Sequence, residues 1–270
     1  MSIRPLSLAI VSDLHIGSKA CTPDLRGQPI SGRRTFLDQF SEFIKTNAIA
    51  ADFLVLPGDM SEIADPHEFD KASNLVEAVA SELKVKSDSV FFVPGNHDVD
   101  WSVLKQEVDG KAQPIHPVRW GQRYDGIRNS ANVFAKSLSC GTGTYFEQPH
   151  FAYWQKPEVV CVGYNSSWHD KPGQQHTGNI NLDDLAQLSS RFDELRLQDF
   201  HGVKIFLVHH HVLQYAQVLW EDVSIAQNAE ALLDVLEKFK FDLLVHGHRH
   251  IPRFQILKRN DLHPEHSAEP

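Results

Sequence analysis

The chain has 270 residues, of which 41% are hydrophobic and 23% are charged, so it is long enough to bury the core of one large domain. Its formal net charge of −9 opposes long-range attraction to nucleic acid and to anionic membranes. The composition therefore argues against a basic nucleic-acid-binding protein and against a protein that binds membranes through positive charge.

The N-terminal apolar run, residues 6–11, is short and interrupted by Ser7. Such a run is too short for the core of a signal peptide and far too short to span a bilayer. The three cysteines, Cys21, Cys140 and Cys161, have no CxxC spacing, and an odd number favours a reducing compartment. We therefore expect a cytoplasmic protein that makes no membrane contact.

Six short apolar runs rich in Val, Leu, Ile and Phe predict strands that are buried on both faces of a sheet. They lie within residues 6–15, 52–60, 89–98, 158–166, 203–211 and 241–250. Helical periodicity separates these runs, over residues 34–46, 68–83, 183 or 184 to about 197, and 228–239. This alternation of strands and helices favours a layered α/β architecture.

Two regions depart from this alternation. Residues 101–150 contain tryptophans, prolines and a small-residue stretch, and we interpret them as a cap or insertion with one helix around 126–138. Residues 253–258 predict a last short strand. The domain is therefore expected to span residues 1–258, and the polar residues 259–270 to form a disordered tail or the start of a linker to a further C-terminal region.

Polar residues that can bind metal ions stand at the ends of five of the predicted strands. They are Asp13, His15, Asp59, Asn96, His97, His209, His248 and His250. The loops that follow the strands of an α/β sheet gather at one edge, so these residues can converge. Carboxylates and neutral imidazoles suit Mn, Fe, Zn or Ni, and the number of candidates predicts two ions that share one carboxylate. Gly58, Gly95 and Gly247 directly precede candidate ligands and allow sharp turns.

Five short motifs carry a family resemblance: "DLH" (13–15), "GD" (58–59), "GNHD" (95–98), "HH" (209–210) and "GHRH" (247–250). In this order and at strand ends, they resemble the calcineurin-like metallophosphoesterase superfamily, along residues 6–252. The resemblance implies a four-layer αββα sandwich, in which two mixed β-sheets are flanked by helices, with a dinuclear metal site. It also implies that both metal ions hold phosphate oxygens and turn a water molecule into hydroxide, which attacks phosphorus.

Carried over by motif, the resemblance divides the ligands into two sets. One ion is held by Asp13, His15 and His250, and the other by Asn96, His209 and His248, while Asp59 bridges them. His97 is expected beside the substrate phosphate, to stabilise developing charge or protonate the leaving oxygen, and Asp98 to orient His97 or a ligand. The sequence "HHHVL" leaves the choice between His209 and His210 open, and we prefer His209.

The remaining histidines receive weaker expectations. We expect His210, His211 and His246 to lie behind the ligands or to face the substrate. We expect surface or cap positions for His67, His116, His150, His169 and His176, with substrate contact as the alternative for His169. Trp101 and Trp120 are expected to pack in the cap, with stacking on a base as the alternative, and Arg249 to lie at the surface.

The predicted activity is metal-dependent phosphodiester hydrolysis, which the strand-end histidine pair favours. A phosphomonoesterase or a nuclease on the same site is the alternative, although no basic track stands out for a nuclease. Cyclic nucleotides, nucleotides, nucleic acid ends, phospholipid head groups and phosphoproteins stay open as substrates. A non-enzymatic metal-stabilised interaction domain would lack ligands, and a mononuclear barrel hydrolase would order its motifs differently. Residues 93–101 are similar to metallophosphoesterase domains fused to larger signalling or defence proteins, which predicts such a partner.

Overall fold

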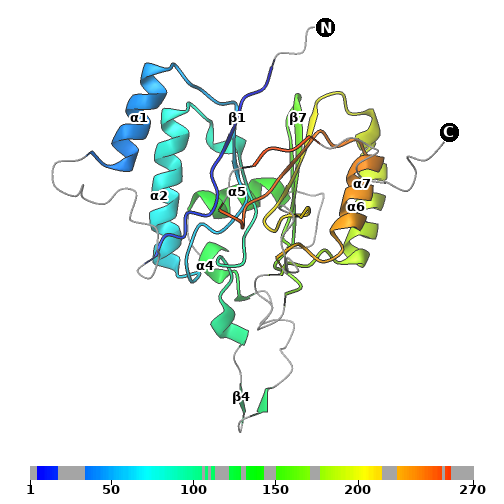
Figure 1. The fold of residues 1–270 in the computed structure, drawn as a ribbon. Coiled ribbons are helices and arrows are strands. Elements are labelled where there is room, and N and C mark those ends of the chain that lie inside the picture. Colours follow the sequence, from blue (N-terminus) through cyan, green and yellow to red (C-terminus); the bar gives the residue numbers. More distant parts are fainter. Residues whose placement is uncertain are drawn as a thin grey trace.

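The computed structural model describes residues 5–17, 34–104, 107–108, 111–112, 122–128, 132–142, 150–170, 177–214, 224–250 and 253–256. Two β-sheets form the centre of the molecule, and helices cover the outer face of each (Figure 1). Among the described helices, none has the length and apolar character needed to cross a membrane.

The first sheet contains three parallel strands in the order β1 (Leu8–Ile10), β2 (Phe53–Leu56) and β3 (Val90–Phe92). Its helices are α1 (Phe36–Thr46), α2 (Pro66–Glu82), the short α4 (Asp125–Arg128) and α5 (Val133–Thr142). Leu54, Leu56 and Phe92 belong to the apolar cluster that these helices cover.

The second sheet is mixed and has the strand order β6 (Phe151–Gln155), β7 (Val159–Tyr164), β8 (Val203–Val208) and β9 (Leu243–Val245). β6 runs antiparallel to β7, and the other pairs are parallel. Helices α6 (Leu182–Glu194) and α7 (Ala229–Lys238) cover its outer face, on the opposite side of the molecule from α1 and α2 (Figure 1).

The two sheets pack against each other through a third apolar cluster. Successive side chains of a strand point to opposite faces, so Phe53 and Val55 of β2 and Ile205 and Leu207 of β8 meet between the sheets. The predicted four-layer αββα sandwich is therefore confirmed. The expectation of two mixed sheets holds for the second sheet, whereas the three described strands of the first are all parallel.

Local sequence explains where the helices begin. Thr35 and Asp38 form a reciprocal capping box at α1, while Asp65 and Asn181 cap α2 and α6 by accepting backbone N–H bonds. Short 3₁₀ turns occur at η2 (Ser87–Ser89), η3 (Trp101–Leu104) and η4 (Leu197–Asp199).

The region 101–150 divides into parts with different surroundings. A small hairpin, β4 (Glu107–Val108) with β5 (Lys111–Ala112), lies away from the two sheets (Figure 1). Helix α5, in contrast, packs into the core, where the Ser137 hydroxyl donates to the Val90 carbonyl at 2.7 Å. The proposed division into domain, cap and tail stays a prediction.

Two details of the expected secondary structure are wrong. The strand β6 was not predicted, because residues 151–155 directly follow the irregular region. The last strand, expected at 253–258, is absent from residues 253–256, and the remaining two residues lie outside the described part. Phe254 and Ile256 alternate as in a strand, but they are 81% and 73% exposed and line a surface pocket.

Candidate metal centre

The predicted ligands are brought together at the carboxyl ends of β1, β2, β3, β8 and β9. Backbone hydrogen bonds join the loops that carry them. The amide of Asp13 donates to the Gly58 carbonyl at 3.1 Å, that of His15 donates to the Asp59 carbonyl at 3.0 Å, and that of Gly247 donates to the His209 carbonyl at 3.0 Å. Loops from distant parts of the sequence therefore form one connected surface.

Several predicted ligands have left-handed backbone conformations, which residues other than glycine rarely adopt. These residues, with their φ angles, are Asp13 (55°), His15 (44°), Asp59 (54°), His248 (76°) and His250 (52°). Each such conformation costs about 1–3 kcal/mol and persists only where the surroundings enforce it. Gly58 also has a positive φ of 96°, and a Cβ there would lie 2.5 Å from the Gly95 nitrogen. The fold thus uses strained turns to aim these side chains at one another.

The first ligand cluster contains Asp13, His15 and His250. The Nε2 atoms of His15 and His250 are 3.1 Å apart, and Asp13 Oδ1 lies 3.7 Å from His250 Nε2. Two imidazole nitrogens that face each other beside a carboxylate are suited to share one cation.

The second cluster converges on His209. Its Nε2 atom lies 3.1 Å from Asn96 Oδ1, 3.2 Å from His248 Nδ1 and 3.2 Å from Asp59 Oδ2. The same Asp59 oxygen is 3.6 Å from His15 Nε2 in the first cluster. One carboxylate oxygen therefore reaches both clusters, as the predicted bridging role of Asp59 requires.

The contacts favour His209 over His210 as the ligand. His209 Nδ1 lies 2.7 Å from the Pro57 carbonyl, a hydrogen bond that leaves Nε2 as the metal-binding atom. His210 Nδ1 lies 2.7 Å from the Ser166 hydroxyl, which leaves its Nε2 atom available as well. His209 differs in that its Nε2 atom contacts Asn96, His248 and Asp59. His210 still lies within reach of an ion at His209 and His248, so the assignment stays a prediction.

His97 lies beside both clusters and makes two contacts with residues of the loop after β2. Its backbone amide donates to Asp59 Oδ1 at 2.8 Å, and its Nδ1 atom lies 2.9 Å from the Glu62 carbonyl. In the second contact, Nδ1 carries a proton and donates it to the Glu62 carbonyl. Nε2 is therefore the ring atom that can exchange a proton with a substrate.

Asp98 is fully buried and accepts hydrogen bonds from two ligand loops. Its oxygens accept from the amides of Met60 and Ser61 at 2.9 Å, from the Ser61 hydroxyl at 3.0 Å and from the Gly95 amide at 3.0 Å. Burial raises the pKa of Asp98 to about 6, aided by the Asp59 charge and opposed by the backbone hydrogen bonds. These contacts fit a residue that positions the loops of Asp59 and Asn96.

Glu62 is a functional candidate that sequence reasoning missed. Its Oε2 atom lies 3.2 Å from His15 Nδ1, on the side of the ring opposite the metal cluster. Glu68 fixes this loop because its Oε2 atom accepts from the amides of Glu62 at 3.0 Å and of Ile63 at 2.9 Å. Neither residue belongs to a recognised motif, and only the fold reveals their positions.

The other histidines and aromatic residues fall in varied places. His67 is exposed as expected, and His116, His176 and Trp120 lie outside the described residues. His150, expected at the surface or in a cap, is 5% exposed, because its ring packs against Phe151 and Trp168. It is therefore not a surface residue, and its place in a cap stays a prediction. Trp101 Nε1 donates to the Asn96 carbonyl at 2.7 Å, and Arg249 Nη1 donates to the Ser224 hydroxyl at 2.9 Å. The centroid of the His211 ring lies 6.1 Å from those of His246 and His248.

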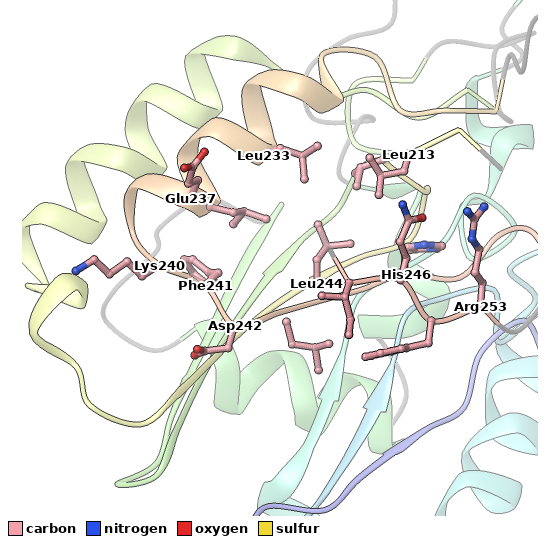
Figure 2. A pocket seen from close by; sticks show the side chains of 15 residues that line it. Leu213, Leu233, Glu237, Lys240, Phe241, Asp242, Leu244, His246 and Arg253 are labelled. Atoms are coloured by element: carbon pink, nitrogen blue, oxygen red, sulfur yellow. The ribbon is translucent and has the colours of Figure 1, made fainter. Parts of the chain in front are cut away.

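Two pockets lie near the metal centre. One, of about 570 Å³, borders His97 and is lined by residues 62–66 and by residues 96, 97 and 99–102. Figure 2 shows the other, of about 530 Å³, in which leucines surround the middle, His246 and Arg253 lie at one end, and Lys240 and Asp242 lie at the other. None of the predicted ligands lines the second pocket, so the first pocket is the one relevant to chemistry at the metal centre.

An αββα sandwich with two adjoining Asp/His clusters at its strand ends is the arrangement of a metal-dependent phosphoester hydrolase. The chain belongs to the calcineurin-like phosphoesterase family, which matches residues 6–252. This family depends on a dinuclear metal centre, and the carboxylate, amide and imidazole donors of the two clusters fit such ions. The resemblance stated from the motifs is confirmed.

Comparison with solved structures finds matches of low sequence identity. Purple acid phosphatase PPD1 from yellow lupin (Lupinus luteus) seeds is 13% identical, with a TM-score of 0.50 over 93% of this chain and 39% of that chain. The phosphopantetheinyl hydrolase PptH from Mycobacterium tuberculosis is 15% identical, with a TM-score of 0.41 over 93% of this chain and 85% of that chain. The chain thus spans less than half of the lupin enzyme, and the likeness concerns the fold. No curated protein matches the sequence significantly.

Binding of metal ions is expected to release a proton from His209. Burial lowers the pKa of His209, but the neighbouring Asp59 carboxylate outweighs it and raises the pKa to about 9 in the metal-free protein. At pH 7 the imidazole is therefore protonated, and an ion at Nε2 must displace that proton. Manganese affinity should rise by up to about tenfold per pH unit below pH 9, since one proton is exchanged. Calorimetric titration in two buffers of different ionisation enthalpy measures the release, and affinity independent of pH between 6 and 8 would contradict it.

Proposed function

We propose that the chain hydrolyses phosphodiesters at this metal centre. The observation that carries the proposal is the pocket of about 570 Å³ beside His97. A phosphodiester carries a second alcohol substituent that a monoester lacks, and this pocket offers room for it next to the group expected to protonate the leaving oxygen. Ile63, Val99 and Trp101 supply apolar lining for such a substituent.

The charge of the pocket supports the same choice. Among the described residues, its lining contains three carboxylates, Glu62, Asp65 and Asp100, and no Lys or Arg. A phosphomonoester carries about −1.5 to −2 charges at pH 7, because its second pKa is about 6, whereas a diester carries one. Carboxylates repel the more highly charged substrate more strongly, so this lining disfavours monoesters.

The residues of the chain divide the chemistry among them. When bound, the metal pair would hold the phosphate oxygens and supply a nucleophilic water near neutral pH. Asp59 Oδ2 lies close to both ligand clusters, and Asp59 Oδ1 accepts a hydrogen bond from the His97 amide. His97, held at Nδ1 by the Glu62 carbonyl, donates a proton from Nε2 to the departing oxygen.

Turnover of two chromogenic esters tests the proposal. With Mn²⁺, we expect a higher kcat/KM for bis(p-nitrophenyl) phosphate than for p-nitrophenyl phosphate. Loss of a positioned general acid typically costs 10²–10⁴-fold, so His97→Ala should lower diester turnover by roughly this factor with its metal content unchanged. His67→Ala, at an exposed position on α2, is the matched control. A preference for the monoester would overturn the proposal, and metal binding without turnover of either ester would indicate an interaction domain.

The natural substrate and the cellular setting extend this proposal. We propose cyclic nucleotides, nucleotides and nucleic acid ends as candidate substrates, whose hydrolysis rates are to be compared in one panel of assays. Mn, Fe, Zn and Ni are the candidate metal ions for these assays. A cytoplasmic location and association with a larger signalling or defence protein are proposed on the sequence alone.

A further inference from the structure

A further group of side chains that could hold a metal ion lies outside the catalytic centre and shares no residue with it. It contains His150, directly before β6, His169, in the loop after β7, and Asp184, in the first turn of α6. We propose that these three residues bind a third metal ion, of the zinc type, that holds the three segments together.

The distances suit a tetrahedral site. His150 Nε2 lies 3.2 Å from Asp184 Oδ1, and His169 Nε2 lies 2.7 Å from Asp184 Oδ2. All three donors lie within 4.8 Å of one another. Zinc bonds to His and Asp are about 2.0–2.2 Å long, so tetrahedral ligands are separated by roughly 3.3–3.6 Å. Small side-chain shifts would therefore bring these donors into coordination.

The buried state of His150 provides independent support. The residue is 5% exposed, and neither ring nitrogen has a hydrogen-bond partner among the described residues, since the 3.2 Å contact with Asp184 does not have hydrogen-bond geometry. Buried polar groups without partners are rare and costly. The ring is held in place by Phe151 and Trp168, with centroids 4.3 and 5.4 Å away. An ion at Nε2 would give this nitrogen the partner that the described residues do not provide in hydrogen-bond geometry.

Asp184 has a further contact that is typical of a metal-binding carboxylate. The Tyr164 hydroxyl donates to its Oδ2 atom at 2.9 Å, which is the outer hydrogen bond that commonly orients metal-binding carboxylates.

The site is accessible from one side, and its place in the fold indicates a structural role. The His169 side chain is 29% exposed, so an ion can enter and a water molecule can fill the fourth position. The loop that carries His169 also carries Ser166, whose hydroxyl contacts His210 beside the catalytic centre. A bound ion would therefore fix the loop that supports this histidine.

Zinc content tests the proposal with the substitution His169→Gln. Glutamine can still donate an N–H to Asp184, so a purely hydrogen-bonded cluster would tolerate it, whereas a metal site would lose a ligand. The full chain is loaded with Zn²⁺, desalted and measured by elemental analysis. We expect His169→Gln to retain one zinc per chain fewer than wild type, and His201→Gln, at an exposed position, to match wild type.

The same comparison is repeated in a chain carrying Asp59→Asn and His209→Ala, which weaken the catalytic centre. Loss of one zinc on adding His169→Gln there shows that the site is independent of the proposed function. Equal zinc in wild type and His169→Gln would overturn the proposal. Should circular dichroism show that His169→Gln does not fold, Asp184→Asn, which keeps the side-chain shape, replaces it with the same expected loss.

Discussion

The substitution Asp59→Asn is expected to lower phosphoester turnover about 10³-fold or more, since loss of several kcal/mol of transition-state stabilisation by a metal ion costs tenfold for each 1.36 kcal/mol. The physical reason is the position of Asp59 Oδ2, which lies 3.2 Å from His209 Nε2 and 3.6 Å from His15 Nε2. A neutral amide cannot balance two cations as a shared carboxylate does, so at least one bound ion should be lost.

Activity and metal content must be measured together in this experiment. Asparagine has the shape of aspartate and keeps an oxygen that can accept from the His97 amide, so the fold should survive. Asp70→Asn, at an exposed position on α2, is the control and should behave as wild type. Full metal content and turnover in Asp59→Asn would rule out the bridging role.

The substitution Asp98→Ala is expected to destabilise the metal-free protein by roughly 3–5 kcal/mol, since each buried donor left without a partner costs about 1–3 kcal/mol. The Asp98 carboxylate is fully buried and accepts from the backbone amides of Met60, Ser61 and Gly95. Alanine leaves these three amides without their acceptor. The loops of Asp59 and Asn96 should also shift, so turnover should fall by a further 10–100-fold, the usual effect of losing an outer support of a metal site.

Urea unfolding followed by circular dichroism measures this effect. The midpoint should fall in Asp98→Ala with little change in slope, because the surface exposed on unfolding is similar. Asp98→Asn is the graded control: its oxygen can still accept from Met60 and Ser61, while its amide group meets the Gly95 amide unfavourably. An unchanged midpoint in Asp98→Ala would show that these hydrogen bonds contribute nothing to stability.

Much of the architecture could be predicted from local sequence. The strands β2, β3, β7 and β8 are nearly continuous apolar runs because both of their faces are buried, and this pattern is visible without the fold. The strand β6 was missed although it is equally buried, since its neighbours in sequence gave no helical or turn boundary on which to place it.

Contacts between side chains that are far apart in sequence could not be predicted in this way. Glu62 supports His15, and the group of His150, His169 and Asp184 joins three segments, yet no spacing rule relates these residues. Their positions depend on how the loops after β2 and β7 lie against neighbouring elements. A pattern along the chain carries no information about such contacts between distant loops.

The sequence by itself determined which donors are available and that each follows a strand, because apolar runs and glycine-containing turns are local properties. Only the tertiary structure decided which atoms meet. Parallel pairing sets β1, β2 and β3 side by side, and left-handed turns at Asp13, Asp59 and His248 aim the side chains inward. The contact between His209 Nδ1 and the Pro57 carbonyl likewise exists only in the fold, since the two residues are 152 positions apart in sequence and 2.7 Å apart in space.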